Sequence, residues 1–263
     1  MPNIDRLVEV IETLRSPNGC PWDRAQTLES MRAYLLEETH EVLDAIGLPP
    51  SDPHRNEQIA EELGDLLFNV LMMVRIATDQ DIANLEDIAG AIADKMIIRH
   101  PHVFGDDAQR ADGMSLERWE SAKVKQKKRR SRLEGIPTAL PSLLRAHRQG
   151  QKAALVGFDW PSVDGVFEKV GEELQELREA ITSGVSSAIA AEYGDVLMAT
   201  SSLGRHIDVE PEIALQQANN RFRDRFQCME ELAQQQGLDL STLTEDALDA
   251  LWEQSKRSLH HDG

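Results

Sequence analysis

Two short acidic motifs carry the side chains best suited to chemistry. Glu38 and Glu41 stand three residues apart in LLEETHEVLDAI, and Glu62 and Asp65 repeat that spacing in EELGD. A step of three residues on an α-helix turns about 300°, so the members of each pair lie side by side on one face. Like charges at this spacing destabilise a helix. The arrangement therefore needs a physical reason.

The second half of the chain repeats the pattern. Glu173 and Glu176 occur in EELQE, and Glu192 and Asp195 follow in AEYGD. NGCPWD and VGFDW precede the acids of the two halves, and two cations four residues apart and a tryptophan follow them in each. Such an ordered recurrence indicates an internal duplication. The residues that follow the acids are Lys95, Arg99, Trp119 and Lys123 in the first half, and Arg221, Arg225, Trp252 and Lys256 in the second.

Helix packing would bring the four acids of each half together. In the first half we expect two apolar stripes to face each other, with the acids along their edges. The stripes are Leu35, Val42, Leu43 and Ile46 on one helix, and Leu63, Leu66, Leu67, Val70 and Val74 on the other. Four uncompensated carboxylates at a core boundary would destabilise the fold or retain protons. Mg²⁺ takes oxygen ligands from carboxylates and substrate phosphates. We therefore expect a magnesium site, with a solvated acidic helix face as the alternative.

Other residues near the acids fit this hypothesis. Gly64 and Gly194 lie inside the expected helices, where each costs about 1 kcal/mol relative to alanine, and this favours a tight helix contact or a bend. The cation pairs would suit the outer phosphates of a nucleotide, with surface ion pairing as the alternative. Trp119 and Trp252 could stack on a base, although their spacing favours a role in the core.

Composition limits the class of protein. The chain has 263 residues and a net charge of −18, and 41% of its residues are hydrophobic. Leu, Ala, Glu and Gln are frequent, and strand-like alternation is scarce, so we expect an essentially all-α protein. No apolar run is long enough to span a membrane. Cys20 and Cys228 are expected to be free thiols in a reducing cytoplasm.

The domain boundary is expected where prolines and a glycine interrupt the helical pattern. We predict an N-terminal domain over 1–130, a linker over 131–142 and a C-terminal domain over 143–263.

The motifs CPWD, EETHEVLDAI, EELGDLLF, RHPHVF, VGFDW and AEYGDVL resemble those of the two-domain MazG family of nucleoside triphosphate pyrophosphohydrolases. The resemblance covers almost the whole chain. It implies two tandem all-α helical bundles of the MazG type, usually assembled as a homodimer. It also implies Mg²⁺-dependent hydrolysis of nucleoside triphosphates to the monophosphate and pyrophosphate, with Mn²⁺ as a substitute for Mg²⁺.

The resemblance also assigns roles to residues of the second half. Metal ligands would be Glu173, Glu176, Glu192 and Asp195; Glu172 would be a supporting acid; Lys169, Arg221 and Arg225 would contact phosphates; and Trp252 would lie near the nucleotide. Glu172 or Glu176 could position the attacking water or accept its proton.

The first half offers Glu38, Glu41, Glu62 and Asp65, with Lys95 and Arg99, as a second, weaker site or a structural copy. Tyr34 stands where the second half has Lys169. The extra cation lies where a triphosphate would gain most from it. We therefore expect the main active site in the second half.

Two other functions also fit parts of the sequence. A di-iron carboxylate site would need an E-x-x-H motif on two helices. Glu37 and His40 provide one such motif, but Gln175 occupies the equivalent position in the second half. The basic run KVKQKKRRSR, residues 123–132, could bind nucleic acid or an acidic protein, or could be a solvated helix end that offsets an acidic body.

Overall fold

The computed structural model describes residues 2–106 and 131–261, and the regular elements in those ranges are all helices. The all-α prediction is confirmed. Spatial contacts divide the chain into two compact units, Met1–Lys123 and Val124–Gly263. No helix of the described ranges is both long and apolar enough to cross a membrane.

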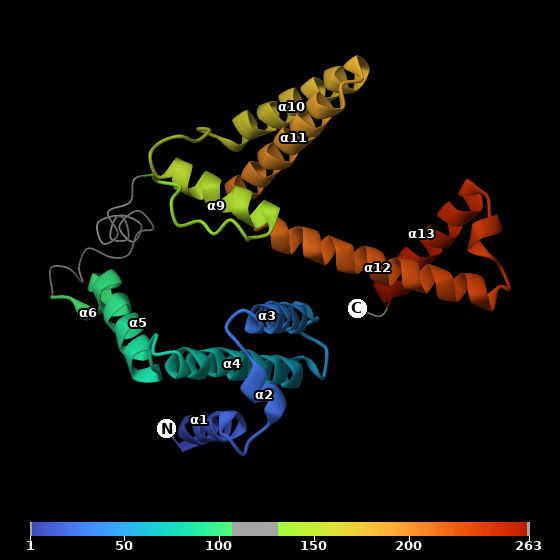
Figure 1. The fold of residues 1–263 in the computed structure, drawn as a ribbon. Coiled ribbons are helices and arrows are strands. Elements are labelled where there is room, and N and C mark those ends of the chain that lie inside the picture. Colours follow the sequence, from blue (N-terminus) through green and yellow to red (C-terminus); the bar gives the residue numbers. More distant parts are fainter. Residues whose placement is uncertain (1, 107–130, 262–263) are drawn as a thin grey trace. The chain divides into compact units, whose positions relative to one another are not determined.

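The first unit is built around a pair of long helices (Figure 1). Its described helices are α1 (Pro2–Arg15), α2 (Pro21–Ala25), α3 (Met31–Gly47), α4 (Arg55–Asp79), α5 (Leu85–Arg99) and α6 (Pro101–Phe104). Helix α3 packs on α4, and α1 packs on α4 as well. The buried cluster that joins these helices contains Ile11, Met31, Leu71, Met72 and Ile76.

The second unit repeats the pair of long helices. Its described elements are α9 (Ser142–Ala154), α10 (Val163–Ser183), α11 (Ser186–His206), α12 (Pro211–Gln235), the 3₁₀-helix η1 (Leu240–Thr242) and α13 (Glu245–His261). Helices α10 and α11 pack on each other, α9 packs on α11, and α12 packs on α13 (Figure 1). A separate core of Met229, Ala233 and Leu251 joins α12 to α13.

A tight turn connects α10 to α11 and allows the two helices to pack against each other. Helix α10 ends at Gly184, which adopts the left-handed conformation with φ of 69°. Glycine adopts this conformation without the steric penalty of a Cβ atom, and it commonly ends helices in this way. Because α11 begins only two residues later, at Ser186, the two helices run back along each other.

The prediction of a buried apolar stripe on α4 is wrong in part. Leu63, Leu67 and Val70 are exposed, and so is Ile46 of α3. The buried side of α4 runs instead through Asn69, Leu71, Met72, Ile76 and Ala77. Helix α4 therefore turns the side that contains Asn69 inward and leaves most of its predicted stripe on the surface of the unit.

The predicted division into 1–130, 131–142 and 143–263 stays a proposal. Part of the expected linker contacts α9, since the Lys152 ammonium group donates a hydrogen bond of 3.0 Å to the Glu134 carbonyl oxygen. Trp119, Lys123 and most of the basic run 123–132 lie outside the described residues.

Candidate metal and phosphate site

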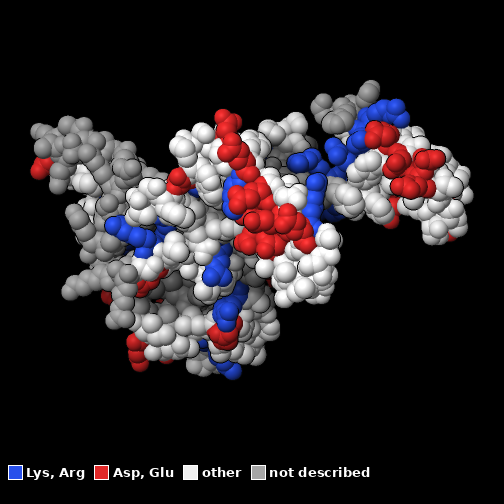
Figure 2. Space-filling view, turned by 90° about the horizontal axis from the view of Figure 1, so that it is seen from above, with Lys and Arg blue, Asp and Glu red and all other residues white. Residues whose placement is uncertain are grey.

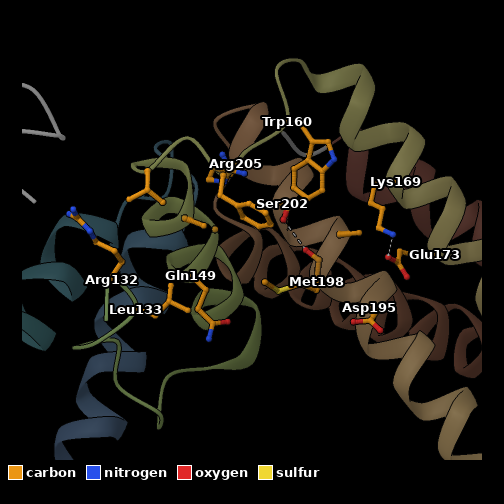
Figure 3. A pocket seen from close by; sticks show the side chains of 15 residues that line it. Arg132, Leu133, Gln149, Trp160, Lys169, Glu173, Asp195, Met198, Ser202 and Arg205 are labelled. Atoms are coloured by element: carbon orange, nitrogen blue, oxygen red, sulfur yellow. Dashed lines mark hydrogen bonds and ion pairs between the residues drawn. The ribbon is translucent and has the colours of Figure 1, made fainter. Parts of the chain in front are cut away.

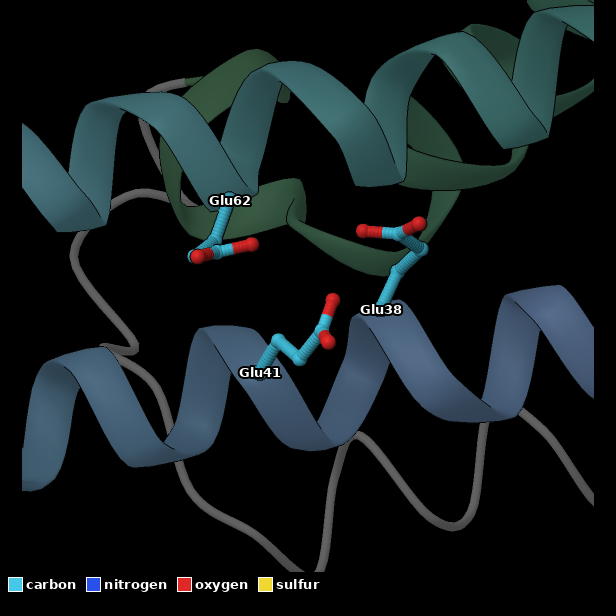
Figure 4. Close-up of side chains that lie close together, drawn as sticks. All are labelled: Glu38, Glu41 and Glu62. Carbon is cyan, nitrogen blue, oxygen red and sulfur yellow. The ribbon is translucent and has the colours of Figure 1, made fainter.

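Both helix pairs bring three acidic side chains together. In the first unit, ligand atoms of Glu38, Glu41 and Glu62 all lie within 4.8 Å of one another. In Figure 4, Glu38 and Glu41 of α3 extend toward Glu62 of α4. Below, this set is called the first acid group. The i,i+3 spacing places two acids on one face of α3, and helix packing supplies the third.

The second acid group consists of Glu173, Glu176 and Glu192, whose ligand atoms also lie within 4.8 Å of one another. Glu173 and Glu176 come from α10 and Glu192 comes from α11. Asp65 and Asp195 do not belong to these tight groups. Asp195 instead lines a pocket together with Glu173.

Burial and mutual repulsion both perturb the first acid group. Burial raises the pKa of Glu38, and the neighbouring charges of Glu41, Asp65 and Glu62 raise it further. Burial and the charges of Glu41, Glu61 and Asp65 likewise raise the pKa of Glu62. Glu38 Oε2 is buried without a hydrogen-bond partner among the described residues. A cation would relieve this repulsion.

A lysine partly compensates the second acid group. The Lys169 ammonium group lies 2.8 Å from Glu173 Oε1 and 3.0 Å from Glu172 Oε1. Hydrogen bonds to Glu173 and Glu172 raise the pKa of Lys169, so this side chain keeps its charge. Burial raises the pKa of Glu176, and the Glu173 charge raises it further, whereas the Lys169 charge lowers it. Glu173 itself is only 7% exposed.

The two halves differ in the side chain that occupies the position of this lysine. Tyr34, its counterpart, packs against the core of the first unit. Its ring meets that of Trp22 edge to face, with the centroids 5.7 Å apart. The first acid group therefore has an aromatic side chain where the second has a cation.

An apolar pocket of about 530 Å³ adjoins the second acid group (Figure 3). Lys169, Glu173 and Asp195 form part of its lining. The remainder comes from the segment before α9, from α9, from the segment before α10 and from α11: Arg132, Leu133, Gln149, Gly150, Ala153, Val156, Phe158, Trp160, Met198, Ala199, Ser202 and Arg205. Sequence reasoning missed the part played by α9, because the acidic motifs carry no information about its position.

An ion-pair network fixes one side of this pocket. Arg205 donates two hydrogen bonds to the Asp159 carboxylate, at 2.5 and 2.6 Å, and the His206 ring nitrogen lies 2.9 Å from the same group. The hydrogen bond from Arg205 is the main reason that the pKa of Asp159 falls to about 2. This network ties the segment before α10 to the end of α11.

The other predicted contact residues lie on different helices. Arg221 and Arg225 are on α12, and Trp252 is on α13. Trp252 packs against the α12–α13 core, and its ring centroid lies 5.4 Å from that of Phe222. In the first unit, Lys95 and Arg99 lie on α5. None of these residues is in an acid group or in the pocket lining within the described ranges.

The tight helix contact that was one explanation for the motif glycines is not found, and the other explanation, a bend, stays a prediction. A Cβ atom built on Gly64 or Gly194 would meet no described atom within 4 Å, its own helix backbone apart. His40 is exposed and lies outside the first acid group, which fits neither a di-iron site nor any other histidine ligation there.

Acidic side chains gather into patches on the face shown in Figure 2, where lysines and arginines border the larger one. A triphosphate would be repelled by such patches unless cations lay at the point of contact. Among the described residues, Lys169 is the lysine that contacts the second acid group directly.

Comparison with known proteins identifies clear relatives. A MazG nucleotide pyrophosphohydrolase domain matches residues 26–104, a range that contains the first acid group. The chain is 41% identical over 265 residues to a nucleoside triphosphate pyrophosphohydrolase of Escherichia coli (strain K12), covering 98% of each chain. It is also 41% identical over 254 residues to the nucleoside triphosphate pyrophosphohydrolase/pyrophosphatase MazG of Thermotoga maritima, covering 96% of this chain and 95% of the relative.

Proposed function

Since the chain belongs to the MazG family of nucleotide pyrophosphohydrolases, we propose that it cleaves nucleoside and deoxynucleoside triphosphates to the monophosphate and pyrophosphate at the second acid group. The chain is a hydrolase that acts on phosphoric anhydride bonds. The proposal adds the location of the reaction and the metal on which it depends. One observation carries it: three carboxylates lie within 4.8 Å of one another, beside an ammonium group 2.8 Å from Glu173.

The donor atoms fit a hard divalent cation. Glu173, Glu176 and Glu192 offer carboxylate oxygens only, and we propose Asp195 as the fourth ligand. Mg²⁺ prefers such oxygen ligands, and Mn²⁺ would substitute for it. Burial and the Glu173 charge raise the pKa of Glu176 although the Lys169 charge lowers it, which is consistent with anions that one lysine compensates only in part. When bound, the cation would neutralise charge on the phosphate oxygens and on the leaving pyrophosphate.

The protein's own groups would bind and activate the reactants. Lys169 holds Glu172 and Glu173 in place and would donate a hydrogen bond to a phosphate oxygen. Glu172 or Glu176 would orient the water and accept its proton.

Residues outside the pocket lining keep the roles that the resemblance implied, as proposals. Arg221 and Arg225 would contact the outer phosphates, and Trp252 would lie near the nucleotide. The first acid group with Asp65 would form a second, weaker site, for which Lys95 and Arg99 are the cations. The missing counterpart of Lys169 supports the lower rank of this site.

A homodimer is proposed on the basis of exposed apolar side chains. Leu63, Leu67 and Val70 of α4 and Tyr193 and Leu197 of α11 are each more than a third exposed within the chain. Contiguous exposed apolar surface commonly marks a protein interface. We further propose a cytoplasmic location, which fits two free cysteines.

Measurement of pyrophosphate release by the full chain tests this function. Release should require Mg²⁺ or Mn²⁺, and it should stop when a chelator is added. Asp195→Ala should abolish release and keep the helical circular dichroism signal, whereas Glu179→Ala, at an exposed acid of α10 outside the group, should keep the activity. Full release in the presence of chelator, or by the Asp195 variant, would contradict the proposal.

A further inference from the structure

Helix α9 supplies one wall of the pocket through residues that include Gly150 and Ala153. It packs against α11 and against α12 (Figure 1). The contact with α11 is close, since a Cβ atom on Gly150 would lie 3.2 Å from Arg205 Nε. The Ser201 hydroxyl of α11 also donates a hydrogen bond of 3.3 Å to the Leu143 carbonyl oxygen of α9. The position of α9 therefore contributes to the shape of the pocket.

A buried histidine lies on α9. His147 is only 7% exposed, and its Nε2 atom lies 3.0 Å from the amide nitrogen of Gln151. Arg148 donates a hydrogen bond of 2.8 Å to the side-chain oxygen of Gln151. Because that oxygen faces Arg148, the amide nitrogen faces the ring. An amide nitrogen only donates, so His147 Nε2 must accept, and the ring is neutral with its proton on Nδ1.

We propose that neutral His147, with Gln151 and Arg148, is a latch that holds α9 in place beside the pocket, and that protonation of the ring at mildly acidic pH releases α9. The added proton would enter at Nε2, where it would meet an N–H group of Gln151. Two donors cannot hydrogen-bond to each other. Either the ring or the Gln151 side chain must then turn, and a turn of Gln151 also breaks its hydrogen bond with Arg148.

The surroundings of the ring oppose a positive charge. Burial is the main reason that the pKa of His147 is lowered from 6.5, and the charges of Arg148 on α9 and Arg205 on α11 lower it further. Two groups act in the opposite direction, namely the charge of Glu210 before α12 and the nearby backbone of Ser201 on α11. These groups come from each described helix that packs on this part of α9. Their balance keeps the ring neutral at pH 7.

A partner for the charged ring is present at the start of α12. Glu210 caps that helix, and its Oε2 atom accepts a hydrogen bond of 2.8 Å from the Ile213 backbone N–H. Glu210 Oε1 and His147 Nδ1 are both buried and make no hydrogen bond of normal geometry with the described residues. A positively charged ring would be attracted toward the Glu210 carboxylate and away from Gln151. Protonation would thus exchange a contact inside α9 for one with α12.

The lowered pKa fixes the direction of the pH dependence. A histidine whose pKa is lower in the folded state binds fewer protons folded than unfolded. The stability that neutral His147 contributes is therefore complete above pH 6.5 and is lost as the pH falls from 6.5 toward the lowered value. In that range a single histidine changes an opening equilibrium by up to about ten-fold per pH unit.

Hydrogen exchange of the full chain tests the latch. The backbone amides of α9 are followed by mass spectrometry at about pH 7.5 and about pH 5, in the wild type and in His147→Gln. Glutamine is neutral at both pH values, and its side-chain oxygen can accept a hydrogen bond from Gln151. The two proteins should exchange alike at the higher pH, and α9 of the wild type should exchange about ten-fold faster at the lower pH. Comparison at equal pH removes the effect of pH on chemical exchange.

Gln151→Glu keeps His147 and changes its partner. A carboxylate accepts a hydrogen bond from a protonated Nε2. Protonation would no longer break the latch, so α9 of this variant should stay protected at about pH 5. His40→Gln is the matched control, because it removes an exposed histidine of the first unit. It should behave as the wild type does at both pH values.

The proposal is overturned if α9 of the wild type exchanges no faster than α9 of His147→Gln at about pH 5. It is also overturned if Gln151→Glu loses protection as the wild type does, or if His40→Gln protects α9. Fast exchange of His147→Gln already at about pH 7.5 would indicate a packing defect, and Gln151→Glu then decides.

Pyrophosphate release with Mg²⁺ gives a second readout, which rests on the proposed function. The ratio of the wild-type KM to that of His147→Gln should be about one at the higher pH and should rise up to about ten-fold at the lower pH. A ratio that stays at one would show that the latch does not control the pocket and would overturn that part of the proposal. A wild type without activity would contradict the proposed function alone, because hydrogen exchange is measured without substrate.

Discussion

At the scale of single residues, burial and repulsion between carboxylates together raise the pKa of acids in both groups. The i,i+3 spacing predicted which acids share a helix face, and packing of α3 on α4 and of α10 on α11 brings them together. Spacing alone did not show that Asp65 and Asp195 would fall outside the tight groups. Their positions depend on how deeply each helix packs, and this is a tertiary property.

The raised pKa values predict an unusual pH dependence in the absence of metal. An acid whose pKa is higher in the folded state binds more protons folded than unfolded. For Glu38, Glu62 and Glu176, stability should therefore be lost as the pH rises from 4.5 through the raised values. A bound cation would reverse this loss, because metal ligands bind in their deprotonated form.

Addition of Mg²⁺ to metal-free protein at neutral pH should therefore raise the melting temperature. At a hundred-fold excess over Kd the expected stabilisation is about 2.7 kcal/mol. Glu192→Gln should reduce the shift, and Glu179→Gln, outside the group, should not. Calorimetric melting curves with and without Mg²⁺ measure the shift in each variant. Equal shifts in the two variants would show that the cation binds elsewhere.

At the scale of elements, the helix pairs were predictable and the pocket was not. The duplicated motifs indicated two equivalent pairs of helices, and the structure has them as α3–α4 and α10–α11. The apolar residues of α4 were misleading because Leu63, Leu67 and Val70 are exposed within the unit. The Asp159–Arg205 pair joins residues 46 positions apart, and no local spacing reveals such a contact.

Two glycines of α11 should respond in opposite ways to the same substitution. A Cβ atom on Gly204 would lie 2.8 Å from the Val209 carbonyl oxygen, so Gly204→Ala should destabilise the protein by about 1–3 kcal/mol. Gly194 has open space, so Gly194→Ala should leave stability unchanged or raise it by up to about 1 kcal/mol. Urea unfolding of the two variants measures the difference. Equal destabilisation would contradict the described packing.

The Asp159 network should stabilise the fold in a defined pH range. The pKa of Asp159 is lowered from 3.8 to about 2, so its contribution is present above pH 4 and is lost as the pH falls toward 2. With allowance for partial exposure, Asp159→Asn should cost roughly 1–2 kcal/mol at pH 7. The difference from wild type in urea unfolding should shrink as the pH approaches 2. A difference that stays constant down to that pH would exclude the ion pair as its origin.

At the scale of the whole molecule, an acidic enzyme must bind an acidic substrate. With a net charge of −18, the protein needs cations at the point where a triphosphate binds. The second unit combines acids that could hold a metal, a lysine that contacts them and an adjoining pocket. The first unit has the acids and lacks the lysine. The duplication could be predicted from the sequence. The difference between the surroundings of the two acid groups could be seen only in the structure.

The most direct test compares equivalent acids of the two halves. Glu62 and Glu192 occupy the same position of the repeated motif, each in its own acid group. In steady-state pyrophosphate release by the full chain with Mg²⁺, Glu192→Gln should lower kcat/KM at least about 100-fold. Glu62→Gln should change it by no more than about two-fold. Retained activity in the Glu192 variant, with loss in the Glu62 variant, would place catalysis in the first unit and contradict this account.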